Sequence, residues 1–357
     1  MNEFSIMRGQ QQIAQLSLMD YAAGMAYTVS EGTCTKTKLT GPFQPFCIPD
    51  SAPPAIPMYF GTGDNKINVM NYVLADPAGI ITSLLVSDGC VPFSNTTINM
   101  AGASPYALSL GYNGTTIGIK DPSVFDVPAE CKHDTDPVRV ARGKMRATLL
   151  KNLMQPEPIK VDPVQQAPRK CCFPQKFQSP GGMIGLVETG GKTYFQSTNL
   201  NISYDATLQK QATVSQTSIN ESPPTIEIEL KDYRDGVQYN VRNGKCFKNP
   251  LKSPMPNCIP DDATYEPMVM GSGATKLKGG VYTYTLHGIK VTDFVTDDCV
   301  LISQILNGNV GPTVEYWYTL GYSALTLGIK DEKVFDVPAT CKNATEVENA
   351  RLSVWQI

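Results

Sequence analysis

Apolar and polar residues alternate with a period of two over much of the chain, which is typical of β-strands with two unlike faces. In one such segment Ile226, Ile228 and Leu230 alternate with Glu227 and Glu229, as in a strand with one solvated face. Further segments each present an apolar or aromatic face, formed by Tyr282, Tyr284 and Leu286 and by Val314, Tyr316, Tyr318 and Leu320. The pattern predicts an all-β fold of antiparallel strands.

The sequence contains an internal repeat, in which one β-rich module occurs twice. The segment LGYNGTTIGIKDPSVFDVPAECK at residues 110–132 recurs as LGYSALTLGIKDEKVFDVPATCK at residues 320–342. Cysteines upstream of it match in nearly the same register, Cys47 with Cys258 and Cys90 with Cys299. Because the register hardly drifts, the two copies are expected to share one topology.

We therefore expect two tandem antiparallel modules of β-sandwich or half-barrel type, over residues 1–132 and 171–357. Each is expected to end in a short helix, formed by the first half of a linker over residues 133–170 and by residues 347–357. Within the linker, the segment from Arg139 to Arg142 has the R-x-x-R form that secretory convertases cut. A solvated basic linker is the favoured interpretation of that segment.

Module one is predicted to lack its beginning. Module two opens with Cys171 and Cys172, and their counterparts in module one would fall before Met1. Residues 1–12 are polar and contain no apolar signal-peptide core. We expect the signal peptide and the first strands of module one to lie upstream of Met1.

The composition is that of a soluble globular protein, with 41% hydrophobic and 18% charged residues. A formal net charge of -3 leaves no basic surplus to neutralise phosphates, which argues against nucleic acid as a partner. Apolar stretches are too short to span a bilayer, so no transmembrane segment is expected.

Ten cysteines together with Asn-x-Ser/Thr sequons favour a secreted, disulfide-bonded glycoprotein. The sequons lie at Asn95, Asn113, Asn201, Asn220 and Asn343. Zinc is a weaker alternative, because the chain has no C-x-x-C pair and only two histidines.

No catalytic site is recognisable in the sequence. His287 is the only histidine inside a module and its counterpart is Ala78, so a surface histidine is favoured over a general base. Carboxylates that recur in both copies are Asp50, Asp121, Asp126, Asp261, Asp331 and Asp336. They offer oxygen ligands for calcium, but no EF-hand spacing is present and turn formation is the favoured interpretation. We expect no enzymatic activity and no cofactor, with calcium as the alternative and no metal ligands assigned.

The runs LGIKDEKVFDVPATC and IGIKDPSVFDVPAEC resemble the signature of the ependymin-related protein family. The similarity extends over module two and over most of module one. It implies a secreted or lysosomal glycoprotein without known enzymatic activity. It also implies a fold similar to bacterial lipoprotein carriers, in which curved sheets surround an apolar pocket, and dimers that bind lipids, some with calcium.

The resemblance further implies disulfides from Cys246 to Cys341, from Cys34 to Cys131, and from Cys171 or Cys172 to Cys299. We assign the last bridge to Cys172. A bridge from Cys171 to Cys258 is our own inference, because it would use all six cysteines of module two. Partners for Cys47 and Cys90 are not assigned.

Apolar and aromatic residues of module two are candidates to line the implied pocket, with tyrosine hydroxyls fixing a head group. They are Met268, Met270, Tyr282, Tyr284, Leu286, Phe294, Tyr316 and Tyr318. From the residues alone, an ordinary packed core is the favoured alternative. With the resemblance, we expect a carrier or sensor for a lipid or other hydrophobic molecule, as an intrachain pseudo-dimer or a homodimer. The alternative function is a matrix, cell-adhesion or signalling glycoprotein with filled cores and no small ligand.

Overall fold

The structure is a computed structural model that describes residues 2–8, 11–30, 32–43, 47–77, 79–87, 89–99, 106–132, 170–220, 222–273, 275–286, 288–310 and 314–344. Among these residues, antiparallel β-strands form all regular structure except for four short 3-10 helices. The predicted all-β fold is confirmed. His133, His287, the R-x-x-R segment and the helices predicted in the linker and in residues 347–357 lie outside the described residues.

The chain divides into two compact units. Unit 1 consists of Met1–Ile48 and Gly118–Gln166, and unit 2 consists of Pro49–Ile117 and Ala167–Ile357. Module one is therefore shared between the two units, whereas the described part of module two lies in unit 2. The compact units and the sequence modules have different boundaries.

Unit 1 contains a four-stranded antiparallel sheet in the order β1-β2-β3-β4. Its strands are β1 (Asn2–Arg8), β2 (Gln11–Asp20), β3 (Met25–Ser30) and β4 (Thr33–Lys38). Two 3-10 helices of the same unit are η1 (Pro122–Phe125) and η2 (Ala129–Cys131). Gly24 and Gly32 adopt positive φ angles of 65° and 73° at the two hairpin turns, where glycine avoids a steric cost.

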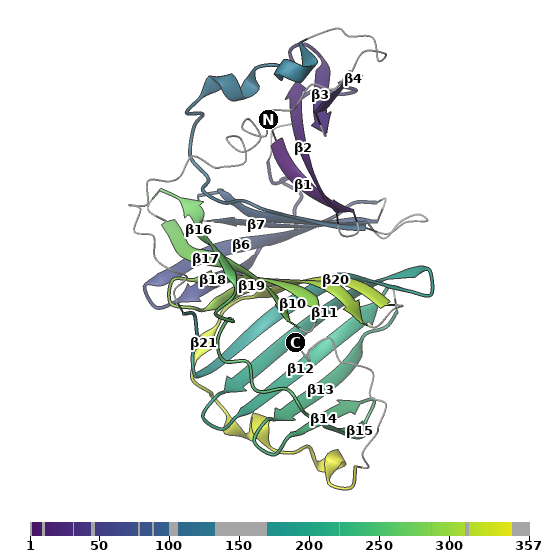
Figure 1. Cartoon of the computed structure of the whole chain (residues 1–357), viewed down its shortest axis with the longest axis vertical. Coiled ribbons are helices and arrows are strands. Elements are labelled where there is room, and N and C mark those ends of the chain that lie inside the picture. Colours follow the sequence, from purple (N-terminus) through teal and green to yellow (C-terminus); the bar gives the residue numbers. More distant parts are fainter. Residues whose placement is uncertain are drawn as a thin grey trace. The chain divides into compact units, whose positions relative to one another are not determined.

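Unit 2 contains one continuous antiparallel sheet built from module two, in the order β15-β14-β13-β12-β11-β10-β20-β19-β18-β17-β16 (Figure 1). Its strands are β10 (Lys176–Thr189), β11 (Lys192–Asp205), β12 (Lys210–Ile219), β13 (Thr225–Asp232), β14 (Val237–Arg242), β15 (Lys245–Pro250), β16 (Thr264–Ser272), β17 (Thr275–Leu286), β18 (Ile289–Thr296), β19 (Leu301–Val310) and β20 (Val314–Tyr322). A short strand, β21 (Thr326–Leu327), also pairs with β10. The centre of this sheet is the pairing of β10 with β20.

The sheet curves around a core on one face. Side chains from β10, β11, β18, β19 and β20 form a single buried cluster that includes Met183, Leu200, Val291 and Tyr318. The register of these neighbouring strands places the clustered side chains on one face of the sheet. We call this the inner face of the sheet, and we call its opposite the outer face.

Towards β13 and β14, the inner face becomes polar while it stays buried. Lys231 Nζ lies 3.2 Å from Glu229 Oε1, and Gln238 Nε2 donates a hydrogen bond of 2.8 Å to Glu229 Oε2. Ile226 and Ile228 point to the outer face, where they are 61% and 36% exposed. The predicted alternation is present in β13, but the polar side is the buried one because it faces the interior of the curved sheet.

A second sheet of unit 2 comes from module one and packs on the outer face of β16–β19. Its strands, in spatial order, are β5 (Ile56–Thr62), β6 (Asn65–Ala75), β7 (Ile80–Ser87), β8 (Pro92–Asn99) and β9 (Tyr106–Gly111). The two sheets share one apolar cluster, which we call the cross-module core. Equivalent residues of both copies meet in it: Phe60 and Met270, Ile67 and Leu277, Phe93 and Ile302.

Module one contains no described counterpart of β10 and β11. In module two these central strands connect the β12–β15 half of the sheet to the β16–β20 half. Without them the β1–β4 and β5–β9 halves of module one form separate sheets. This difference accounts for the division of module one between two compact units.

The disulfides correct one of our assignments. Cys34–Cys131 and Cys246–Cys341 are present, but Cys171 bonds Cys299 and Cys172 bonds Cys258, the reverse of the assigned partners. Adjacent residues of an extended chain point to opposite sides. Cys171 is 1% exposed and lies in a buried cluster beside Cys299, whereas Cys172 faces outward and pairs with the neighbouring segment at Cys258. Cys47 and Cys90 are unpaired and exposed.

Candidate ligand-binding cavity

Residues 324–338, which we call the strap, follow β20 and cross the outer face of β10–β13. The strap contains β21 and the 3-10 helix η3 (Glu332–Phe335), and it leads into η4 (Ala339–Cys341). Phe335 is 4% exposed and packs against Ala212 and Leu230. The Cys246–Cys341 disulfide then joins η4 to β15. The strap is thus fixed to the sheet near its start by β21, near its end by Phe335, and just beyond its end by the disulfide.

The recurring carboxylates build turns in the family signature. Asp331 Oδ1 accepts a hydrogen bond of 3.0 Å from the amide of Lys333 and caps η3. In module one Asp121 accepts one of 2.9 Å from the amide of Ser123 and caps η1, and the bond to Ser123 holds the pKa of Asp121 below its usual range. Among the described residues, no group of three or more His, Cys, Asp or Glu side chains is arranged to hold a metal ion. Calcium binding stays a prediction.

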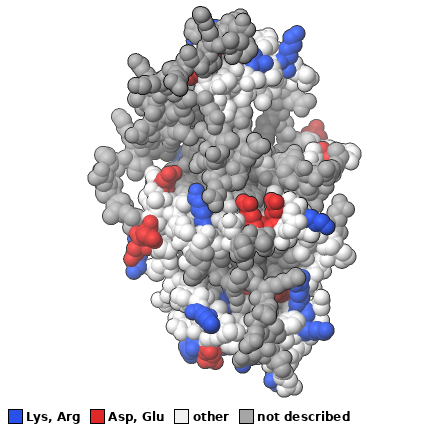
Figure 2. All heavy atoms as spheres, turned by 45° about the vertical axis from the view of Figure 1, so that its right-hand side comes forward, with Lys and Arg blue, Asp and Glu red and all other residues white. Residues whose placement is uncertain are grey.

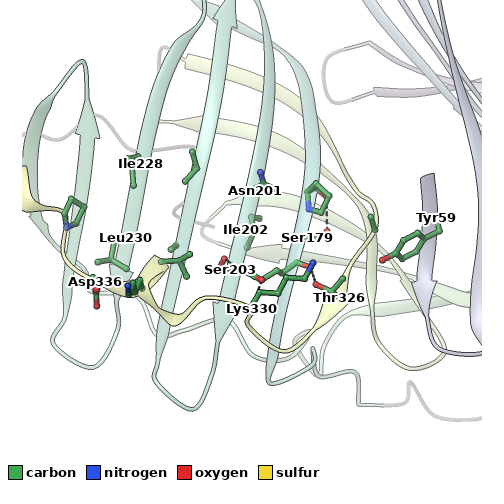
Figure 3. Close-up of a pocket in the computed structure, with 18 residues that line it drawn as sticks. Tyr59, Ser179, Asn201, Ile202, Ser203, Ile228, Leu230, Thr326, Lys330 and Asp336 are labelled. Atoms are coloured by element: carbon green, nitrogen blue, oxygen red, sulfur yellow. Dashed lines mark hydrogen bonds between the residues drawn. The ribbon is translucent and has the colours of Figure 1, made fainter. Parts of the chain in front are cut away.

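A cavity of about 740 Å³ lies between the strap and the outer face of the sheet (Figure 3). Its floor consists of two rows of cross-strand neighbours that run over β10, β11, β12 and β13. The first row is Gln178, Ser203, Ala212 and Leu230, and the second is Pro180, Asn201, Val214 and Ile228. Thr326, Lys330, Lys333, Val334, Asp336 and Pro338 of the strap line the other side.

The floor of this cavity has a polar end and an apolar end. On β10 and β11, Gln178, Asn201 and Ser203 present amide and hydroxyl groups. On β12 and β13 the floor is hydrocarbon alone, and Val214 and Ile228 there are 48% and 36% exposed. Apolar side chains that stay this exposed inside a cavity mark surface that a ligand can cover.

The polar end is held in place by hydrogen bonds to the strap and by module one. The amide of Lys330 donates a hydrogen bond of 3.0 Å to Gln178 Oε1, which places this lysine over the polar end of the floor. Tyr59 of β5 donates through its hydroxyl to the carbonyl of Leu325 at 3.4 Å. Figure 3 shows Tyr59 at one end of the cavity, Ile228 and Leu230 at the other, and Lys330 between them. Both sequence modules therefore contribute to the cavity.

On the face shown in Figure 2, acidic and basic side chains of the described residues are interspersed. No described helix has the length and apolar character needed to cross a bilayer.

None of the residues predicted to line a pocket lines this cavity. Met268, Met270 and Phe294 belong to the cross-module core. Tyr284, Leu286, Tyr316 and Tyr318 belong to the inner-face cluster, and Tyr282 packs beside the Cys171–Cys299 disulfide. Burial raises the pKa of Tyr316 to about 12, and it raises the pKa of Tyr318 further. The structure thus brings the predicted residues together in three packed clusters.

Alternation of apolar and polar residues alone does not identify the residues that line the cavity. The alternation of Ile226, Ile228 and Leu230 correctly groups them on one side of β13. It does not say that a strap from a distant part of the sequence covers only part of that side. The signal that identifies the site is the family signature itself, because its residues form the strap.

The five sequons lie in different environments. Asn113, Asn201, Asn220 and Asn343 are exposed, and Asn201 lines the cavity. Asn95 lies on β8, between β7 and β9, and its Oδ1 atom is buried. Glycosylation at these residues stays a prediction.

Comparisons with known proteins agree with the repeated signature. A protein-family model described as Ependymin matches residues 9–131 and again residues 220–341. Ependymin-related protein 1 of Haliotis asinina is 30% identical over 125 residues, which are 32% of this chain and 62% of that protein. Ependymin-related protein 2 of the same organism is 28% identical over 126 residues, 32% of this chain and 63% of that protein. The chain therefore spans less than two thirds of the length of these two relatives.

The chain is also similar to a crystal structure of a DUF1329 family protein from Desulfovibrio piger, with 8% sequence identity. The aligned region covers 46% of this chain and 90% of that protein. The TM-score of 0.22 is too low for this likeness to inform either the fold or the function.

Proposed function

Because the chain belongs to the ependymin family, we propose that it is a secreted, non-enzymatic protein that binds an amphiphilic lipid in the cavity beneath the strap. The observation that carries this proposal is the division of the cavity floor into a polar and an apolar end. A single-chain amphiphile has the same division, so its tail would cover Val214 and Ile228 and its head group would lie near Asn201.

Burial of the tail supplies the binding free energy. Each buried methylene contributes about 0.8 kcal/mol, so a tail with eight buried methylenes gains about 6 kcal/mol before the cost of association. A volume of about 740 Å³ lies within the usual range for small-molecule sites. The apolar end of the floor supports tail binding without any charged contact.

The strap favours an anionic head group. Lys330 and Lys333 line the cavity together with Asp336, which leaves a surplus of one positive charge among these three side chains. All three are exposed, so their interactions with a ligand are screened by salt. We expect the tail to determine affinity and the lysines to add a modest preference for a carboxylate or phosphate.

A fluorescence titration with 11-(dansylamino)undecanoic acid tests the proposal. The wild-type chain should bind the probe with an increase and a blue shift of its emission. Ile228→Asp places a charge on the apolar floor and should weaken binding at least tenfold, because the charge must be desolvated when the tail binds. Ile228 is already 36% exposed, so this variant is expected to fold.

Ile226→Asp is the matched control. Ile226 lies on the same strand and the same face, two residues from Ile228, but it is 61% exposed and does not line the cavity. This variant should bind the probe like the wild type. Absence of wild-type binding, or equal weakening in both variants, would show that the cavity is not the lipid site.

The head-group preference has its own arm of the experiment. Lys330→Gln should weaken the carboxylate probe several-fold and leave the corresponding dansyl alcohol unchanged. Equal effects on both probes would limit the role of Lys330 to packing.

Secretion is part of the same proposal. Family membership and four disulfides support an oxidising, extracellular location. The contact between the β5–β9 sheet and module two supports an intrachain pseudo-dimer. Size-exclusion chromatography with light scattering should then give a monomeric mass for the chain.

A matrix or cell-adhesion glycoprotein is the second candidate function. The dense packing of the inner face favours it, because Tyr318 and Leu306, which are 1% and 2% exposed, occupy the interior where the family resemblance implies a pocket. Native mass spectrometry of the protein purified from its source distinguishes the two functions. A ligand-free mass, together with failure of the dansyl titration, would favour the adhesive function.

A further inference from the structure

The two modules build the same turn around one of their cysteines. The amide of Cys90 donates to the carbonyl of Ser87 at 2.9 Å, and the amide of Cys299 donates to that of Thr296 at 2.8 Å. Both cysteines adopt left-handed φ angles, 57° and 60°. The side chains of Ser87 and Thr296 also accept equivalent hydrogen bonds, from the amides of Val91 and Val300, of 3.2 and 2.9 Å. The two cysteines therefore have the same backbone conformation and the same hydrogen bonds around them.

The sulfur atoms of the two cysteines nevertheless differ in their bonding. Cys299 forms a disulfide with Cys171, which lies five residues before Lys176, the first residue of the central strand β10. Cys90 is exposed and unpaired. A left-handed conformation is costly for a residue other than glycine. Cys90 adopts it although Cys90 forms no disulfide.

The second strand after this turn in each module shows a matching difference. In module two, β20 pairs with β19 on one side and with β10 on the other. Within the residues that the structure describes, β9 pairs with β8 alone. Among the described residues, the side chains of β9 on the corresponding face are more exposed than those of β20. Leu108 and Leu110 are 51% and 38% exposed, whereas their counterparts Tyr318 and Leu320 are 1% and 2% exposed.

We propose that the second edge of β9 accepts a β-hairpin of the β10–β11 type, and that a cysteine shortly before this hairpin forms a disulfide with Cys90. Main-chain hydrogen bonds to an open strand edge give such a segment its affinity, and its side chains give specificity. In module two, the pairing of Met183 with Leu320 and of Gly185 with Tyr318 is the template. The incoming strand would cover Leu108 and Leu110 in the same way.

The occupant is a separate hairpin segment and not the β10–β11 hairpin of a second copy of this chain. In a second copy, β10 is already paired on both edges, with β11 and β20, and Cys171 is already bonded to Cys299. Recruitment of that hairpin would require the central strands of module two to leave their sheet.

The covalent step is thiol–disulfide exchange. The Cys90 thiolate attacks the sulfur of a hairpin cysteine that is held in a mixed disulfide, for example with glutathione. The new sulfur–sulfur bond forms as glutathione leaves as a thiolate and takes up a proton. No net oxidant is consumed in this exchange.

The test uses a peptide that corresponds to residues 170–205 of this chain and carries Cys172→Ser, with its remaining cysteine as a glutathione mixed disulfide. Incubated with the full 357-residue chain, it should form a one-to-one adduct through Cys90, identified by mass spectrometry of the linked tryptic peptides. A scrambled peptide with the same cysteine should react at least tenfold more slowly. Cys90→Ser should abolish the adduct, and Cys47→Ser, which removes the other unpaired thiol, should leave it unchanged.

Hydrogen exchange gives a readout that does not depend on the thiol. A peptide with serine at both cysteine positions should slow amide exchange in residues 106–111 at least tenfold and should leave β1–β4 unaffected. Equal reaction rates with the scrambled peptide, or no slowing at residues 106–111, would overturn the proposal. An adduct at Cys299, or a covalent dimer of the chain without peptide, would equally overturn it.

Discussion

The amide of Ala324 donates a hydrogen bond of 2.9 Å to the carbonyl oxygen of Tyr59. The same bond recurs with the roles of the modules exchanged, because the amide of Gly114 donates to the carbonyl oxygen of Val269 at 2.8 Å. Gly114 is the counterpart of Ala324, and Val269 is the counterpart of Tyr59. Reciprocal contacts of this kind characterise isologous, two-fold packing. The β5–β9 sheet and β16–β20 thus pack on each other through reciprocal contacts within unit 2, and this supports the proposed pseudo-dimer.

Truncation of the cross-module core should release this packing. Leu277 is 0% exposed and belongs to the same cluster as its counterpart Ile67. Leu277→Ala should lower the free energy of unfolding by about 3 kcal/mol, because buried leucine-to-alanine changes cost about 2–5 kcal/mol. Leu327→Ala is the control, since that side chain is 63% exposed. Urea denaturation and limited proteolysis of residues 49–117 measure the effect, and equal stability of the two variants would contradict the assignment of the core.

Asp293 is a buried acid on the inner face, and its stability contribution depends on pH. It is 0% exposed, accepts hydrogen bonds of 2.8 Å from the Tyr284 hydroxyl and from Gln304 Nε2, and burial raises its pKa to about 6. Because the folded pKa lies above the unfolded value of about 4, the folded state holds the proton more tightly. The resulting stabilisation is complete below about pH 4 and is lost as the pH rises through about 6.

Asp293→Asn should remove this pH dependence. The amide is uncharged at every pH and keeps a group that Gln304 and Tyr284 can hydrogen-bond. The difference in unfolding free energy between variant and wild type should shift in favour of the variant by about 3 kcal/mol from pH 4 to pH 7, since one pKa unit corresponds to about 1.4 kcal/mol. Denaturant titrations at several pH values measure it. A difference that does not change with pH would mean that Asp293 titrates normally.

Two disulfides of similar span should have similar effects on stability and different effects on ligand binding. The cysteines of Cys246–Cys341 and Cys172–Cys258 are separated by 95 and 86 residues in the sequence. The chain-entropy model therefore assigns each disulfide a stabilisation of about 4–5 kcal/mol. Only the first anchors the strap. Replacement of both of its cysteines by alanine should weaken dansyl-probe binding at least fivefold, and the same replacement at Cys172 and Cys258 should not. Thermal unfolding and probe titration measure the two effects, and equal losses of binding would exclude a specific role of the strap anchor.

The sequence was sufficient for the strands, the repeat and the presence of disulfides, because these depend on local alternation and on the internal match of the two copies. It was insufficient wherever a residue's surroundings come from a distant segment. Met268 was predicted to line a pocket, but β5–β9 rather than a ligand covers its side chain. Ile228 lies beside a cavity only because the strap crosses there. Alternation identifies which residues share a face, whereas the partner of that face depends on tertiary packing.

Glycan attachment should discriminate among the sequons, because they differ in access. Asn220 and Asn343 are exposed, and Asn220 uses only its side-chain oxygen to accept a hydrogen bond from the amide of Phe195, which leaves its nitrogen available. We expect glycans at these two residues.

Asn95 and Asn201 should be unmodified in the folded protein. Asn95 lies on a strand that is paired on both sides and has a buried side-chain oxygen, so a glycan there would have to displace neighbouring side chains. A glycan on Asn201 would occupy the polar end of the cavity. Peptide mapping after enzymatic deglycosylation in heavy-oxygen water detects each modified asparagine as a mass shift. Full occupancy of Asn201 in a protein that still binds the dansyl probe would place the ligand elsewhere, since a branched glycan and a lipid head group cannot share that end of the cavity.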